Sequence, residues 1–91
     1  MAKENYKFIL FVSGMSVKSV RAVENLKLIC DTHLKNRFEL EIIDISKNAD
    51  PAVKYQVFAI PTLIKVEPAP LRTLVGDLSN TEKVLKILDI A

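Results

Sequence analysis

The stretch Ile60-Pro61-Thr62-Leu63-Ile64-Lys65-Val66 decides the fold of this 91-residue chain. A proline opens the stretch, and the mostly apolar run behind it is typical of a strand. A turn that enters a strand is a typical place for a cis X-Pro bond, which costs little, so we expect the Ile60–Pro61 bond to be cis. The alternative is an ordinary trans proline that only ends the preceding helix.

The first half of the chain alternates strands with helices. The run Tyr6 to Val12 is nearly all apolar, which predicts a central strand covered on both faces. Residues 17–34 place apolar side chains at helical spacing, with Ser16 as the N-cap. Phe38 to Ile45 predicts a second strand, parallel to the first through a right-handed crossover. Asp50-Pro51 predicts a short helix over 51–57, with Asp50 as its N-cap.

The second half predicts a hairpin and a last helix. Thr62 to Val66 is the third strand, and Leu71 to Val75 is the fourth. The segment Glu67-Pro68-Ala69-Pro70 between them predicts a stiff connection that joins no ladder. Gly76-Asp77 ends the fourth strand. Ser79-Asn80-Thr81-Glu82 matches a capping box, and the helical pattern behind it continues to Ile90.

The resulting order is βαβαββα, in one α/β domain over residues 1–91. A βαβ unit followed by a helix, a hairpin and a final helix is the thioredoxin arrangement. It brings loop 13–16 and the residues before Pro61 to one end of the sheet, where Phe58 and Ile60 supply an apolar edge and Met15 an adaptable contact. We interpret this end as a protein-docking surface. The alternative is that Phe58 and Ile60 are core residues.

Redox chemistry is not expected from this chain. Thioredoxin-type exchange requires a thiolate at the start of the first helix and a second cysteine three residues later. The loop here is Ser13-Gly14-Met15-Ser16, and a serine without an adjacent base is a far weaker nucleophile. The single Cys30 lies on the apolar stripe of the first helix, where a core role is expected. We therefore predict no catalytic residue.

The composition argues against several other classes. Net charge is +2, with acids and bases interspersed and no dense Lys/Arg cluster of the kind that binds nucleic acid. One cysteine and one histidine exclude an internal disulfide and a cysteine-rich zinc site. Gly14 and Gly76 alone form no phosphate-binding loop. Without a spanning stretch or a signal peptide, we expect a cytoplasmic protein with no membrane partner. Without a ligand motif, we also expect no cofactor and no metal.

Basic side chains are expected around the docking surface. Lys18, Arg21, Lys65 and Arg72 would flank it with positive charge. The alternative is that scattered surface bases serve only solvation.

Several motifs resemble the KaiB family of circadian-clock proteins over nearly the whole chain. They are Leu10-Phe11-Val12-Ser13-Gly14, Ser19-Val20-Arg21-Ala22-Val23, Pro61-Thr62-Leu63-Ile64-Lys65-Val66, Pro68-Ala69-Pro70, and Gly76-Asp77-Leu78-Ser79-Asn80 followed by Glu82-Lys83-Val84-Leu85. The resemblance implies a non-catalytic protein that binds the ATPase ring of a KaiC-like partner, captures a KaiA-like protein and competes with a SasA-like kinase. It also implies two folds, a resting tetramer with a rearranged second half and a thioredoxin-like monomer that binds.

The docking surface and the resemblance together predict two groups of residues. Partner contacts are expected at Gly14, Met15, Lys18, Arg21, Gln56, Phe58, Ile60, Pro61, Lys65 and Arg72. Determinants of the fold are expected at Pro61, Gly76, Asp77, Ser79, Glu82 and Ile87.

The chain departs from the family pattern at informative positions. It has Met15-Ser16-Val17 where Asn-Thr-Pro is usual, Gln56 where a basic residue is usual, Thr73 in place of a second arginine, and Ile87 where glycine is common. A side chain in place of glycine favours a helix by about 0.5–1 kcal/mol. We therefore expect a monomer that rests in the thioredoxin-like fold, with the tetramer as the alternative. A diverged stress or signalling adaptor is the alternative function.

Overall fold

The structure is a computed structural model, which describes residues 5–90. A four-stranded sheet of order β2-β1-β3-β4 forms its centre. The strands are β1 (Tyr6–Val12), β2 (Phe38–Asp44), β3 (Thr62–Glu67) and β4 (Arg72–Val75), and the helices are α1 (Val17–His33), α2 (Asp50–Lys54) and α3 (Thr81–Ile87). β1 pairs parallel with β2 and antiparallel with β3, and β4 pairs antiparallel with β3. The predicted βαβαββα order is confirmed.

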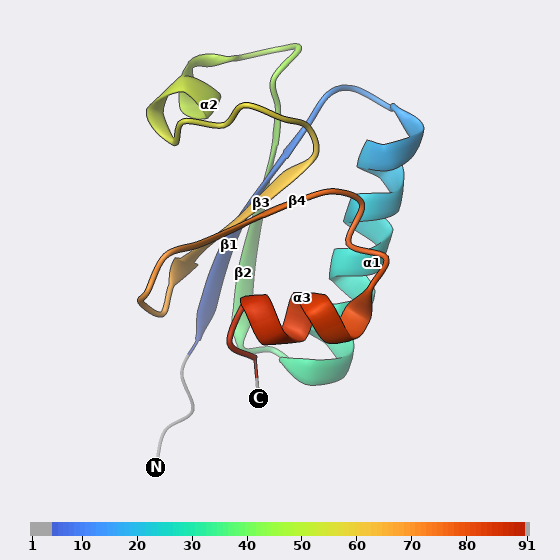
Figure 1. Cartoon of the computed structure of the whole chain (residues 1–91), viewed down its shortest axis with the longest axis vertical. Helices are drawn as coiled ribbons and strands as arrows, with labels where there is room; N and C mark the ends of the chain where they lie inside the picture. Colours follow the sequence, from blue (N-terminus) through green and yellow to red (C-terminus); the bar gives the residue numbers. More distant parts are fainter. Residues whose placement is uncertain (1–4, 91) are drawn as a thin grey trace.

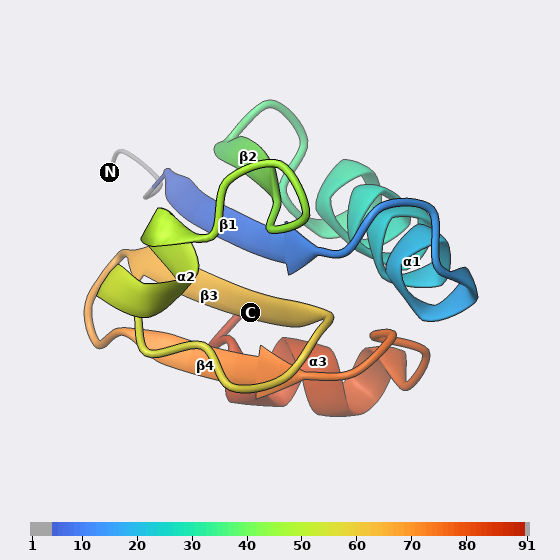
Figure 2. The same ribbon diagram turned by 90° about the horizontal axis from the view of Figure 1, so that it is seen from above.

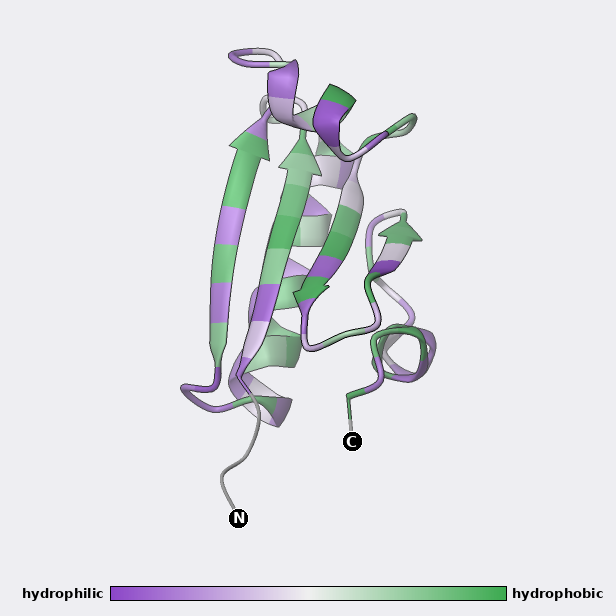
Figure 3. Cartoon of the chain, turned by 90° about the vertical axis from the view of Figure 1, so that its left-hand side faces the viewer, coloured by the Kyte–Doolittle hydropathy of each residue, from purple (hydrophilic) through white to green (hydrophobic). Residues whose placement is uncertain are grey.

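The sheet has a hydrophobic core on each face. Figure 1 shows α1 and α3 on one side of the sheet and α2 on the other. Phe8 and Leu10 of β1 pack in the larger core against α1 and α3, whereas Ile9 and Phe11 pack in the smaller core with Ala52 of α2. Successive strand residues point to opposite faces, so a strand covered on both sides must be apolar throughout. This explains why β1 is largely green in Figure 3, while the edge strand β2 alternates.

Ser16 caps α1 as predicted, but α2 begins and ends differently. The Ser16 side chain accepts a hydrogen bond from the backbone N–H of Ser19. Asp50 is the first residue of α2 and not its N-cap, a position that Ala49 occupies without a side-chain hydrogen bond. The helix stops at Lys54, earlier than predicted, because Gln56 takes a left-handed conformation with φ of 56°.

The C-terminal helix also differs from its sequence pattern. Asn80, not Ser79, caps α3, and its side-chain oxygen accepts from the N–H of Lys83 at 3.1 Å. Ser79 instead closes a turn, in which its own N–H donates to the Asp77 carboxylate at 3.1 Å. The helix ends at Ile87 and does not continue to Ile90.

The connection between β3 and β4 is as long as predicted but lies one residue later, at residues 68–71, so Leu71 belongs to it and not to β4. Glu67 does not belong to a segment outside the ladder, because it is the last residue of β3 and lies opposite Lys7. Pairing ends where Pro68 removes the next backbone donor. Within residues 5–90, no helix has the length and apolar character that a bilayer crossing requires.

A candidate protein-binding surface

Three loops meet at one end of the sheet. Phe11 of β1 lies opposite Thr62 of β3, and Thr62 lies opposite Val75 of β4, so the ends of β1 and β4 lie beside the start of β3. The backbone N–H of Gly76 donates to the carbonyl of Pro61 at 3.0 Å. We call residues 13–16, 55–61 and 75–79 the end surface, which faces the viewer in Figure 2. The Ile60–Pro61 bond is cis, as predicted.

The end surface exposes large apolar side chains. Phe58 is 94% exposed and Met15 87% exposed, so Phe58 is not a core residue. Ile60 is half-buried against the smaller core, and Pro61 is buried. Three exposed apolar residues on or beside this end were missed from the sequence, namely Val17, Val53 and Val75. The exposure of Val75 could have been predicted, because Val75 follows the core residue Leu74 on an edge strand and so points to the opposite face.

An apolar hollow adjoins the first loop. It holds about 230 Å³ and lies between loop 13–16, the first half of α1 and strand β2. Its lining includes Met15, Val20, Val23 and Ile42. A partner's apolar side chain would lose its water there without leaving a polar group unpaired, which is the usual character of a docking pocket.

Loop 13–16 is fixed by hydrogen bonds. Gly14 has a φ of 53°, a conformation that glycine adopts without a steric penalty. Its N–H donates to the Asp44 carboxylate at 3.0 Å, and the Ser46 hydroxyl donates to the same oxygen at 2.6 Å. These bonds, with that of Ser46 largest, lower the pKa of Asp44, which stays ionised as an anchor. No sequence pattern indicates that Asp44 ties this loop to β2.

Residues 5–90 place neither a reactive thiol nor a metal site at the end surface. Cys30 is fully buried in the larger core, as predicted, and burial followed by the charge of Asp31 raises the pKa of its thiol to about 12. Such a thiol stays protonated and inert. The described part of the chain also brings no group of three His, Cys, Asp or Glu residues together as metal ligands.

Two of the predicted basic residues lie at the end surface. Lys18 and Arg21 are exposed on the first turns of α1. Ser79 hydrogen bonds chiefly, and then the charges of Arg21 and Lys18, lower the pKa of Asp77. The two cations therefore lie near the loop that follows β4. Gln56 is also exposed, within segment 55–61.

The other two basic residues lie elsewhere, so their predicted place beside this surface is wrong. Lys65 pairs with Arg72, several residues along the β3–β4 ladder from the Thr62–Val75 pair at the end surface. The Lys65 side chain is 1% exposed, and its ammonium lies 3.6 Å from the Asp89 carboxylate. Arg72 is half-exposed and contacts the same carboxylate oxygen at 3.1 Å. Strand alternation places Lys65 on the face of Leu63, toward the larger core.

The fold is that of a thioredoxin-like protein without the redox thiols. The N-terminal domain of SasA from Synechococcus elongatus superposes with a TM-score of 0.76 at 20% identity, covering 98% of this chain and 88% of that one. Mitochondrial thioredoxin 3 from Saccharomyces cerevisiae superposes with a TM-score of 0.75 at 17% identity, covering 97% and 81%. At these identities the likeness concerns the fold alone.

Sequence comparisons identify the family. The KaiB domain model matches residues 9–90. A circadian clock oscillator protein KaiB from a Picosynechococcus species is 42% identical over 90 residues, covering 99% of this chain and 86% of that protein. The circadian clock protein KaiB3 from a Synechocystis species is 43% identical over 81 residues, covering 89% and 79%. The chain belongs to the KaiB family, whose members are clock regulators and not enzymes.

Proposed function

We propose that this chain is a cytoplasmic clock protein that binds a KaiC-like ATPase ring through its end surface, as a monomer in the thioredoxin-like fold. The observation that carries the proposal is Phe58, a large aromatic side chain that is 94% exposed in the loop before β3. Burying a phenylalanine in an interface contributes about 1.5–3 kcal/mol, and buried aromatic anchors dominate binding energy at interfaces.

The positive charges that border the end surface support a partner with an acidic rim. Lys18 and Arg21 border the end surface, and complementary charge raises the association rate more than the affinity. Lys65 has no place in this contact, because its side chain is buried. Arg72 stays a predicted contact, although it lies away from the end surface.

The experiment measures binding of the full chain to a purified KaiC-family ATPase by fluorescence anisotropy. Phe58→Ala is expected to weaken binding by at least about tenfold, the loss of roughly 1.4 kcal/mol or more. Leu28→Ala is the matched control, since Leu28 is 67% exposed on α1 outside the end surface. Equal affinities of the two variants would contradict docking through Phe58.

Two further partners follow from the same reading. The structural likeness to the SasA N-terminal domain supports competition with a SasA-like kinase for one site on the ring. A KaiA-like protein would bind the assembled complex. Failure to bind any KaiC-family ATPase at high concentration would favour the adaptor function. The exposed Met15 of the first loop and Val17 at the start of α1 support that alternative, because they stand where the family usually has other residues.

A further inference from the structure

A lysine lies buried beneath the C-terminal end of the chain. Lys65 is 1% exposed, on the β3 face that also carries Leu63 of the larger core. Among the residues the structure describes, Asp89 is the acid within ion-pair distance of its ammonium. Leaving an ammonium buried without a partner costs far more than an ordinary lost hydrogen bond. The stability of the sheet face that carries Lys65 therefore depends on where the Asp89 carboxylate lies.

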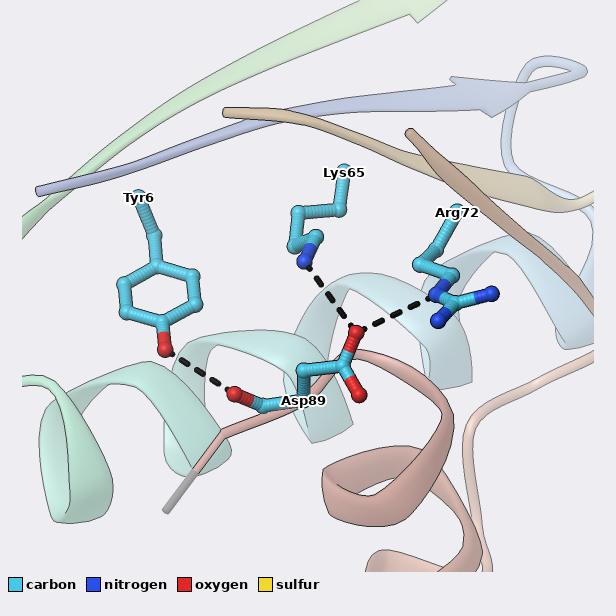
Figure 4. A network of polar contacts seen from close by, with 4 residues as sticks. All are labelled: Tyr6, Lys65, Arg72 and Asp89. Atoms are coloured by element: carbon cyan, nitrogen blue, oxygen red, sulfur yellow. Dashed lines mark hydrogen bonds and ion pairs between the residues drawn. The ribbon is translucent and has the colours of Figure 1, made fainter. Parts of the chain in front are cut away.

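Asp89 joins three strands to the end of the chain. Its carboxylate contacts Lys65 of β3 and Arg72 of β4, and its backbone carbonyl accepts a hydrogen bond from the Tyr6 hydroxyl of β1 at 3.1 Å (Figure 4). The residue has a φ of 57°, which turns the chain sharply after α3. Leu88 and Ile90 on either side are buried in the larger core.

We propose that Asp89 is a latch, which holds residues 81–90 on the sheet so that this segment opens as one unit when the carboxylate charge is lost. Without that charge, the simplest relief for Lys65 is to admit water by lifting the segment above it. The segment is suited to such opening because α3 has only seven residues, too few for a helix that is stable alone. The inference concerns the fold and does not depend on which partner the chain binds.

The surroundings of Asp89 fix the direction of its pH dependence. Arg72 from β4 and Lys65 from β3 face its carboxylate, and the Tyr6 hydroxyl from β1 faces its carbonyl. The Arg72 hydrogen bond first, and then the two positive charges, lower the pKa of Asp89. A lowered pKa stabilises the docked segment above the ordinary aspartate pKa, and this contribution is lost as pH falls through the lowered value. Opening should therefore increase in acid.

Hydrogen exchange measured by NMR on the full chain tests the latch at neutral pH. In Asp89→Asn, the amides of Leu88 and Ile90 should exchange at least about tenfold faster, while that of Leu26 in α1 keeps its rate. Asp77→Asn is the matched control, because Asp77 contacts its own loop and no buried lysine. In Lys65→Met/Asp89→Asn, the apolar side chain removes the need for the latch, so protection should return.

Three results would overturn the latch. They are equal acceleration at Leu26 and Leu88, no acceleration at all, or no rescue by the second substitution. If Asp89→Asn fails to fold, the wild-type chain is titrated from about pH 6 to about pH 3 with correction for intrinsic exchange. As pH falls, the amide of Leu88 should then lose its protection from exchange at a higher pH than the amide of Leu26. The Lys65→Met substitution should abolish that difference between the two amides. A Lys65→Met chain with the same early loss would exclude the latch.

Discussion

At the scale of single residues, burial decides what a side chain does here. The core role of Cys30 could be predicted because free cysteines are usually buried and its position fits the apolar stripe of α1. The burial of Lys65 was missed because lysines are nearly always exposed, although the strand that carries it is apolar on both faces. Its partner Asp89 comes from the far end of the chain, and no local pattern connects the two residues.

The buried thiol leads to a prediction about reactivity. Because the pKa of Cys30 is raised to about 12, the thiolate is scarce at pH 8 and the sulfur is covered by the core. Reaction with an aromatic disulfide reagent, followed by absorbance, should be at least about 100-fold slower in the native chain than in guanidinium. Similar rates in the two conditions would show that the thiol is accessible in the folded protein.

At the scale of elements, the existence of every helix and strand could be predicted, whereas several ends could not. Apolar spacing identifies an element because one face must be buried. An end depends on which side chain reaches the free backbone groups, and neighbouring polar residues compete for that role. At α3, Ser79 and Asn80 are both good caps, and the turn at Asp77 engages the first of them.

Two alanine substitutions test whether Asn80 or Ser79 is the N-cap of α3. Asn80→Ala should lower the free energy of unfolding by about 0.5–2 kcal/mol, because it leaves the Lys83 N–H without its acceptor. Ser79→Ala keeps the backbone bond to Asp77 and should cost only a few tenths of a kcal/mol. Urea denaturation followed by circular dichroism measures both variants. A larger cost for Ser79→Ala would restore the predicted capping box.

At the scale of the whole molecule, the thioredoxin-like fold follows from the order of its elements and from the proline that enters β3. The end surface could be located from the sequence because antiparallel pairing brings the start of β3 beside the end of β1. Its membership could not be predicted fully, since the exposure of Phe58 and Val53 depends on how α2 and the following loop lie over the sheet.

The expectation that a second, tetrameric fold competes with the thioredoxin-like fold can be tested at the end of α3. Ile87 packs half-buried against the larger core, whereas the neighbouring Lys86 is exposed. Both Ile87→Gly and Lys86→Gly lose about 0.5–1 kcal/mol of helix propensity, but only Ile87→Gly also loses core packing. Ile87→Gly should therefore populate the tetramer more, as measured by light scattering and NMR secondary shifts. Indistinguishable variants would exclude a role for Ile87 packing.

The two sulfur atoms of residues 5–90 differ in their susceptibility to oxidation. The Cys30 sulfur is enclosed, while the Met15 thioether stands 87% exposed in the first loop. Peroxide converts an exposed methionine to its polar sulfoxide, which reductases reverse. A burst of oxidant would thus leave the core intact and make the end surface locally hydrophilic, a reversible chemical mark at the place proposed to meet the ATPase.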